Sequence, residues 1–462
     1  MQISRLERNS RALAPAAAEF LIFLLGVLLR LALSRTYDPR AGFDAVEHIR
    51  YFDYIARHDA LPELTFSRVA YHPPLWYVLA SVVWNSGGTL WDVQLISIYA
   101  GILTLVCVWI GLRLYFPNDR FARLMGLGLA AVLPCAIHTQ GMLSNEALCI
   151  LLSTAIFLFI RPAFEASGLR RAGACLGLSL SLSAALLAKA SPLIFFGAFA
   201  LSIGLDLVWR REEGAEAALR RHFPLASALA LAMTLALPVH FRHYANTGLL
   251  FPTGYDAMGY SEQDPAPLWK RRALGFYVAP CLNVIENPYF PECSGVRARF
   301  WSVLVATTFG DYFNYDYAGP PHAGEPSIEL NHRTTALTTV ALTRAPVAAG
   351  MLIAITTAVS TLIGLWGAVR RRDATLVTLC LVPILAVLGQ LYFSVRFPDD
   401  NWGPIKGNYL LFASAPMFAL YGAACSWLWR HPRWRLIGVL QVCGVLAVGA
   451  YSIYARWHAL PQ

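Results

Sequence analysis

The sequence has few charged residues. Only 14% of its 462 residues are Asp, Glu, Lys or Arg, whereas 57% are hydrophobic, and the mean hydropathy is +0.49. A soluble protein of this size carries about 25% charged residues. The deficit excludes an ordinary soluble fold, and it predicts an all-α protein that crosses the membrane many times.

The sequence also lacks the cysteine patterns of metal centres. Its nine cysteines are scattered singly, with no C-x-x-C pair and no Cys/His ligand cluster, which argues against a zinc or iron–sulfur site. Cys281 and Cys293 alone share a long polar loop, and they could form a disulfide if that loop lies outside the cytoplasm. No internal repeat and no low-complexity stretch is present.

The excess of positive charge does not indicate nucleic-acid binding. The net charge is +9, but the arginines form short clusters between apolar runs, which is the pattern of membrane orientation. The basic N-terminus leads into a long apolar run without a clear cleavage site. We therefore expect a retained first transmembrane helix rather than a removed signal peptide.

Apolar runs predict about eleven transmembrane helices. They lie near residues 17–35, 92–113, 121–138, 146–160, 172–188, 191–209, 223–241, 346–369, 374–395, 408–429 and 436–455. Residues 73–84 are also apolar, but twelve residues are too few to cross a bilayer.

The arginine clusters decide how the uncertain run 73–84 is placed. If this run does not cross, all of the clusters fall on the side of the N-terminus, as the positive-inside rule prefers. Residues 36–91 then form one extracytoplasmic loop with two juxtamembrane helices, and residues 242–345 form a second, large one. We expect a transmembrane module over 1–241, this large loop, and C-terminal helices over 346–462, in the inner membrane with the active site facing the periplasm.

The first loop carries the densest group of polar candidates. Asp44, Glu47, His48 and Tyr51 are spaced as one face of a helix. Carboxylates at a membrane edge can act as a general base or hold a divalent cation on a phosphate. The alternative is a solvated face of an ordinary surface helix, and the spacing leaves this choice open.

Three further residues have both a functional and a structural interpretation. Lys189 (in LLAKASP) and Lys406 (in GPIKGNY) could bind a lipid-linked phosphate, or they could be snorkelling interfacial lysines. Glu146 (in SNEAL) could belong to a site, or it could favour the start of a helix as part of an N-terminal cap.

The order of these motifs resembles the GT-C superfamily of integral-membrane glycosyltransferases, which includes protein O-mannosyltransferases and lipid A aminoarabinose transferases. The likeness rests on FDAVEHIRYFDYI, YHPPLWYVL, SNEAL, LLAKAS and KGNYLLFASAP, and it covers about residues 10–210 and 396–420. It implies that Asp44 lies at the active site, that Glu146 matches the second-loop acidic position, and that Lys189 contacts the donor phosphate. The late motif of the family often reads K-x-R-Y, so the missing arginine leaves the phosphate to Lys406 or Arg396.

The resemblance implies an inverting hexosyl or pentosyl transferase of cell-envelope glycan biosynthesis. Its donor would be a polyprenyl-phosphate sugar, and its acceptor a glycan, lipid or protein. We expect Asp44, Glu47 and His48 at the catalytic centre. The expected substrate-binding residues are Tyr51, Tyr71, His72, Asn145, Glu146, Lys189, Arg396, Lys406 and Tyr409.

Two other classes of protein remain open at this point. A transporter or flippase of lipid-linked sugars also places charged residues near its spans, and a non-catalytic subunit of a glycan assembly would share the membrane setting. We expect no nucleic-acid partner. No cofactor is certain, and a divalent cation is one option.

Overall fold

The computed structural model describes residues 3–257, 272–279, 282, 285, 299–310, 337–397 and 405–458. Within these ranges the chain forms helices and no strand. The prediction of an all-α polytopic membrane protein is confirmed. Cys281 and Cys293 lie outside the described residues, so the disulfide stays a prediction.

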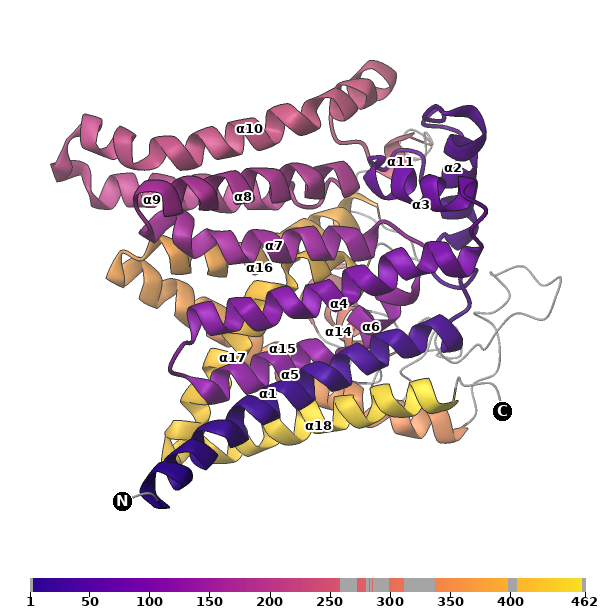
Figure 1. The fold of residues 1–462 in the computed structure, drawn as a ribbon. Coiled ribbons are helices and arrows are strands. Elements are labelled where there is room, and N and C mark those ends of the chain that lie inside the picture. The colour runs from indigo at the N-terminus through magenta and orange to yellow at the C-terminus, as the bar shows by residue number, and fades with distance from the viewer. Residues whose placement is uncertain are drawn as a thin grey trace.

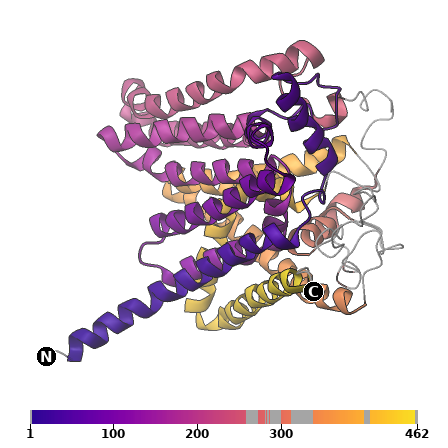
Figure 2. The same cartoon turned by 45° about the vertical axis from the view of Figure 1, so that its right-hand side comes forward.

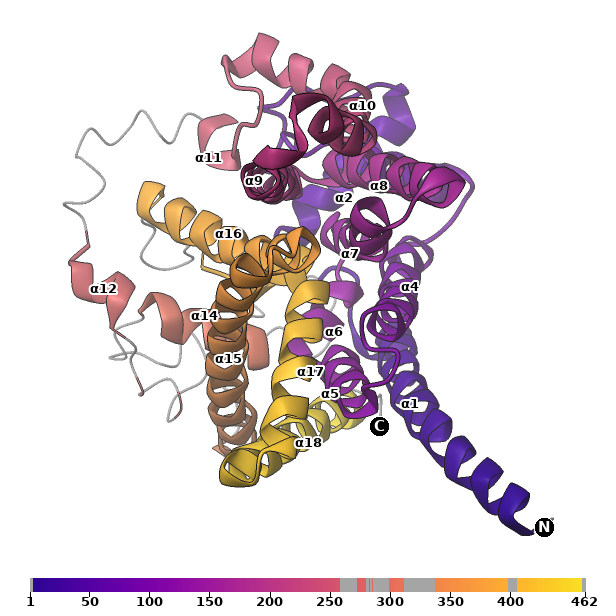
Figure 3. The same cartoon turned by 90° about the vertical axis from the view of Figure 1, so that its left-hand side faces the viewer.

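Helices that run side by side form the body of the molecule (Figure 1). They are α1 (Ile3–Thr36), α4 (Leu90–Tyr115), α5 (Arg120–Val132), α6 (Pro134–Gly141), α7 (Glu146–Glu165), α8 (Gly168–Ala188), α9 (Leu193–Trp209), α10 (Ala215–Thr247), α15 (Leu337–Arg371), α16 (Ala374–Arg396), α17 (Ser414–Arg430) and α18 (Arg435–His458). Helices α8, α9 and α10 lie on one side of the bundle and α15, α17 and α18 on the other (Figure 3).

The remaining helices lie outside this set. They are α2 (Ala45–His58), α3 (Leu75–Asn85), η1 (Arg211–Glu213), α11 (Gly254–Ala257), α12 (Leu274–Val278), α14 (Phe300–Phe309), η4 (Gly407–Ala413) and η5 (Pro432–Trp434). Because α10 continues to Thr247 and α15 already begins at Leu337, the segment between these two spans is shorter than the expected loop 242–345.

The expected count of eleven spans is not confirmed. The described residues contain nine helices long and apolar enough to cross a membrane, or ten if α5 and α6 form one broken span. Helix α9 accounts for the difference, because it has only 17 residues. At 1.5 Å per residue it reaches only about 26 Å, slightly less than the hydrocarbon core of a bilayer.

The break between α5 and α6 is a feature that the hydrophobic run 121–138 did not reveal. The two helices meet at an angle of 44°, because Pro134 has no N–H to donate to the carbonyl of Ala130. The fully buried Arg30 of α1 supplies that bond instead, through Nη2 to Ala130 O at 3.1 Å and Nη1 to Ala131 O at 3.1 Å. An arginine from another helix thus satisfies the freed carbonyls inside the bundle.

The arginine clusters gather at one end of the bundle. Glu19 of α1 pairs with Arg113 at 3.0 Å and with Arg123 at 2.8 Å, so the end of α4 and the start of α5 meet α1 there. Other contacts between clusters at this end are Arg430 with Asp119, Arg171 with the Arg221 carbonyl, and Arg372 with the Trp209 carbonyl. We call this the arginine end.

The opposite end carries the first loop. Helices α2 and α3 pack against each other and lie at the far end of the bundle from the N-terminus, beside α11 (Figures 1 and 2). Helix α3 has 11 residues, so residues 73–84 do not form a span. The two helices expected in the first loop are present as α2 and α3, and we call this end the site end.

Candidate active site

Asp44 occupies an unusual backbone position at the start of α2. It is the N-cap residue, with φ 54° and ψ 25°, in the left-handed region that costs a non-glycine residue energy. Its side chain makes no capping hydrogen bond and the residue is exposed. The fold therefore holds a solvent-facing carboxylate in a conformation that α2 itself does not require, as often occurs at functional sites.

The buried face of α2 packs onto α3 through hydrogen bonds and stacked rings. His48 Nδ1 lies 2.8 Å from the Tyr77 hydroxyl, and the rings of Tyr51 and Tyr77 stack at 3.8 Å between centroids. The Tyr51 hydroxyl donates to the carbonyl of His72 at 3.2 Å. Because His48, Tyr51 and Tyr77 are buried, these contacts fix α2 and α3 as one unit beside Asp44.

The electrostatics of this unit connect it to Glu146 and Lys189. Burial lowers the pKa of His48 to about 4, although Asp44 raises it, and Lys189 lowers it further. Burial also raises the pKa of Tyr77 well above its ordinary value, and the charges of Glu146 and Asp44 act in the same direction. Both carboxylates are therefore near the same phenol.

Glu146 and Lys189 form an ion pair between the start of α7 and the end of α8. The pair joins Lys189 Nζ to Glu146 Oε1, and the two side chains are 12% and 11% exposed. Asn145 strengthens the connection, because its Nδ2 donates to the carbonyl of Ala188 at 2.7 Å. Lys189 therefore points into the protein rather than snorkelling into the interface.

The late motif, which contains Lys406 and Tyr409, also contacts this group of residues. Lys189 Nζ lies 4.7 Å from the ring centroid of Tyr409, and Lys406 Nζ lies 5.7 Å from the same ring. Lys406 also contacts the ring of Phe43 at 3.9 Å, the residue directly before Asp44. Residues far apart in the sequence therefore form a continuous cluster of carboxylates, ammonium groups and aromatic rings.

Two of the expected site residues lie at the edge of this cluster. Glu47 pairs with Arg50 on the outer surface of α2 at 3.2 Å, so it does not share the buried face of His48 and Tyr51. Arg396 pairs with Asp256 of α11 at 3.2 Å. Helix α11 packs closely against Tyr71, which places Arg396 on the flank of the site.

The described residues contain no group of three or more His, Cys, Asp or Glu side chains that could hold a metal ion. Asp44 and Glu47 do not supply a paired site, because Glu47 is turned toward Arg50.

Comparison with solved structures identifies the fold. An oligosaccharyltransferase from Archaeoglobus fulgidus, solved with a tethered acceptor peptide, matches 96% of this chain with a TM-score of 0.55 at 12% identity. The chain covers 56% of that enzyme's length. The fold is that of the GT-C glycosyltransferases.

Other GT-C structures are similar at lower TM-scores. ArnT from Cupriavidus metallidurans gives a TM-score of 0.48 at 13% identity, over 98% of this chain and 76% of that one. The Pmt1–Pmt2 protein O-mannosyltransferase of S. cerevisiae gives 0.39 at 19% identity, over 49% of this chain and 34% of that one. No family model and no curated protein matches the sequence.

Most of the residues expected from the GT-C resemblance come together at the site end. The cluster described above contains Asp44, His48, Tyr51, His72, Asn145, Glu146, Lys189, Lys406 and Tyr409. Tyr77, the hydrogen-bond partner of His48, was not among the residues expected from the sequence. Its position five residues after His72, in the aromatic run of YHPPLWYVL, was the available signal.

His138 was also missed. It lies on α6, and its ring meets Phe43 at 6.3 Å and Tyr37 at 5.3 Å in edge-on contacts. No sequence pattern marks it, since it lies inside an apolar run. Its contact with Phe43 places it next to the residue that precedes Asp44.

Proposed function

We propose that this protein is an inverting glycosyltransferase that moves a sugar from a polyprenyl-phosphate carrier to an acceptor at the extracytoplasmic face of the membrane. The observation that supports the proposal is the assembly of Asp44, the Glu146–Lys189 pair and Lys406 at one end of a GT-C fold. The polyprenyl chain would stay in lipid while the phosphate and sugar reach this end of the bundle.

Asp44 is the general base of the proposed reaction. Its exposed carboxylate can accept the proton of the acceptor hydroxyl as that oxygen attacks the anomeric carbon. The carbon–oxygen bond to the carrier phosphate breaks as the new glycosidic bond forms, so the configuration at the carbon inverts. His48 does not suit this role, because with a pKa of about 4 it is neutral at pH 7, weakly basic and bonded to Tyr77. It positions the start of α2 instead.

Lys189 and Lys406 stabilise the leaving phosphate. The negative charge on the phosphate grows as its bond to the sugar breaks, and fixed ammonium groups in a water-poor site stabilise such a charge strongly. Glu146 holds the Lys189 ammonium in place before the donor binds. The rings of Tyr409 and Phe43, which the two lysines contact, offer apolar faces to the carrier or the sugar.

The proposed side of the membrane follows from the charge distribution. The arginine clusters meet at the end of the bundle opposite the site, and basic clusters prefer the cytoplasm. The site then faces the periplasm when the protein resides in the inner membrane.

The proposal is tested with purified protein in lipid nanodiscs and radiolabelled polyprenyl-phosphate hexoses and pentoses, with solubilised cell-envelope material as the acceptor pool. We expect label to leave the carrier and enter an acceptor with wild type, but not with Asp44→Asn. The glycan, lipid or protein fraction that gains the label identifies the acceptor class. In proteoliposomes, label that crosses the membrane while still attached to its carrier would instead indicate a flippase. No transfer from any carrier would contradict the proposal.

A further inference from the structure

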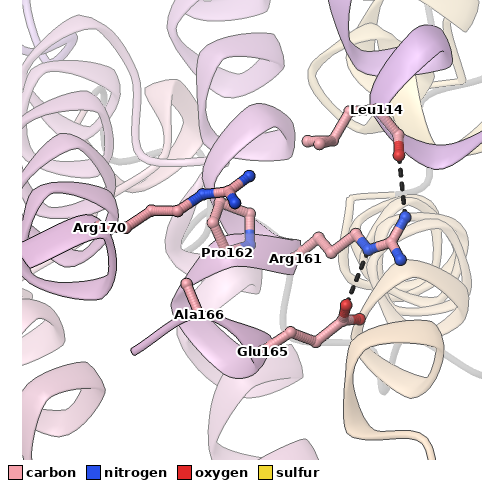
Figure 4. Close-up of a pocket in the computed structure, with 6 residues that line it drawn as sticks. All are labelled: Leu114, Arg161, Pro162, Glu165, Ala166 and Arg170. Carbon is pink, nitrogen blue, oxygen red and sulfur yellow. Dashed lines mark hydrogen bonds and ion pairs between the residues drawn. The ribbon is translucent and has the colours of Figure 1, made fainter. Parts of the chain in front are cut away.

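A pocket at the arginine end has no part in the proposed reaction. It has a volume of about 240 Å³ and lies where α7 ends and α8 begins, beside the end of α4. Its lining residues are Leu114, Arg161, Pro162, Glu165, Ala166 and Arg170 (Figure 4). Helix α7 has 20 residues and carries Glu146 at its other end, so the pocket lies about 30 Å from the site.

The charges that line this pocket favour an anion. Arg161 donates from Nε to Glu165 at 2.8 Å and from Nη1 to the carbonyl of Leu114 at 2.9 Å, which fixes its guanidinium at the pocket wall. Arg170 reaches toward the same space from α8, and Figure 4 shows no interaction between it and another residue of the pocket. Two guanidinium groups and one carboxylate therefore line the pocket, and one positive charge remains for a ligand.

The surface beside the pocket is suited to an acyl chain. Leu169, the neighbour of Arg170, is 92% exposed. Leu176 and Leu180 are also exposed, and their spacing from Leu169 places all three on one face of α8. An apolar stripe thus runs along α8 beginning next to Arg170 of the pocket, as required for a ligand with a charged head and a long apolar tail.

We propose that this pocket binds the phosphodiester headgroup of an anionic phospholipid, with an acyl chain lying along the leucine stripe of α8. The shared chemistry is a singly charged phosphate between Arg161 and Arg170. A zwitterionic lipid is disfavoured, because its ammonium would meet the second guanidinium. The lipid would bind at the turn of the α7–α8 hairpin, whose open end holds the Glu146–Lys189 pair. The proposal does not depend on the glycosyl-transfer function.

The test measures lipid retained by the full-length protein in native mass spectrometry after exchange with equimolar phosphatidylglycerol and phosphatidylcholine. We expect the wild type to retain phosphatidylglycerol preferentially. In Arg170→Gln this retention should fall about tenfold, as expected for a lost charged hydrogen bond, whereas Arg170→Lys should retain much of it. Arg170 is exposed at the start of α8, so the Gln variant should fold normally, which a melting curve in lipid-free detergent checks.

The matched control is Arg220→Gln, which removes an exposed arginine of the same end that pairs with Glu216 rather than lining the pocket. It should leave lipid retention unchanged. Equal retention of both lipids by the wild type, or equal losses in Arg170→Gln and Arg220→Gln, would overturn the proposal. In a second arm, inorganic phosphate should not raise the melting temperature as phosphatidylglycerol does. Equal protection by phosphate would show a site for the free anion and would also overturn the lipid assignment.

Discussion

At the scale of single residues, the candidate site is defined by how burial and backbone conformation distinguish similar side chains. Asp44 and Glu47 are both carboxylates of the same motif, yet Asp44 lies at a left-handed N-cap beside Phe43, and Glu47 pairs with Arg50 on the outer surface. The spacing predicted one face for both, because it treated Asp44 as a helical residue. A helical spacing pattern does not indicate that a residue other than glycine adopts the left-handed backbone conformation.

His48 predicts a pH dependence of stability. Its pKa is about 4 in the folded protein and about 6.5 when unfolded, so the stability that depends on a neutral His48 is fully present above pH 6.5 and is lost as the pH falls toward 4. At about 1.4 kcal/mol for each pH unit, the loss is about 3 kcal/mol. Unfolding free energies measured between pH 7 and 4 should fall more steeply for the wild type than for His48→Gln. A His48 ring that titrates near 6.5 by NMR would contradict this account.

Lys189 is predicted to act on donor binding. Lys189→Ala removes the ammonium group that pairs with Glu146 and faces Tyr409, so donor binding should weaken by about 1.5 to 3 kcal/mol, the effect of a lost charged hydrogen bond. Equilibrium binding of a polyprenyl-phosphate sugar measures this. Lys189→Arg, which keeps the charge, serves as the control. An unchanged donor affinity in Lys189→Ala would show that the lysine does not bind the donor and serves only in the ion pair with Glu146.

At the scale of elements, the sequence predicted α2, α3, the start of α7 and the end of α8. The reason is local: caps, prolines and charge clusters mark these boundaries. Helix α7 ends five residues later, and α8 begins four residues earlier, than the apolar runs 146–160 and 172–188 indicated. The break between α5 and α6 was not predicted, although the sequence contains Pro134 at this position. A proline inside an apolar run does not reveal whether another helix will supply the missing hydrogen bonds, and here Arg30 supplies them from α1.

The α5–α6 break should therefore depend on Arg30. Arg30→Leu leaves the carbonyls of Ala130 and Ala131 without this donor, at about 1 to 3 kcal/mol for each buried group. We expect a clear loss of stability in detergent unfolding, with a smaller effect on the stability of Arg35→Leu, which changes an exposed arginine of the same helix. Equal stability of the two variants would show that the break forms without Arg30.

At the scale of the whole molecule, hydropathy and arginine position predicted the all-α fold and the gathering of the polar candidates at one end. They did not establish the span count, because α9 lies at the lower limit of length. They also could not place Arg396, which pairs with Asp256 across 140 positions of sequence. Contacts of this kind depend on how the helices pack, which single-sequence patterns do not record.

The proposed orientation predicts from which side of the membrane a thiol reagent reaches the first loop. Ser86 is exposed just after α3, so Ser86→Cys should react with a membrane-impermeant maleimide added to the outside of intact spheroplasts. The background Cys281→Ser, Cys293→Ser and Cys443→Ser removes the two cysteines of the expected outer loop and an exposed native thiol. Labelling that requires permeabilised cells would place the site on the cytoplasmic side.

The most direct test of the central claim compares turnover and donor binding in Asp44→Asn. This change keeps the shape of the side chain and removes its proton acceptor, so turnover should fall by roughly 10² to 10⁴ while the affinity for a polyprenyl-phosphate sugar stays nearly unchanged. Glu47→Gln, which alters the outward-facing carboxylate of the same motif, should retain turnover. Normal turnover in Asp44→Asn would remove Asp44 from the chemistry and contradict the account.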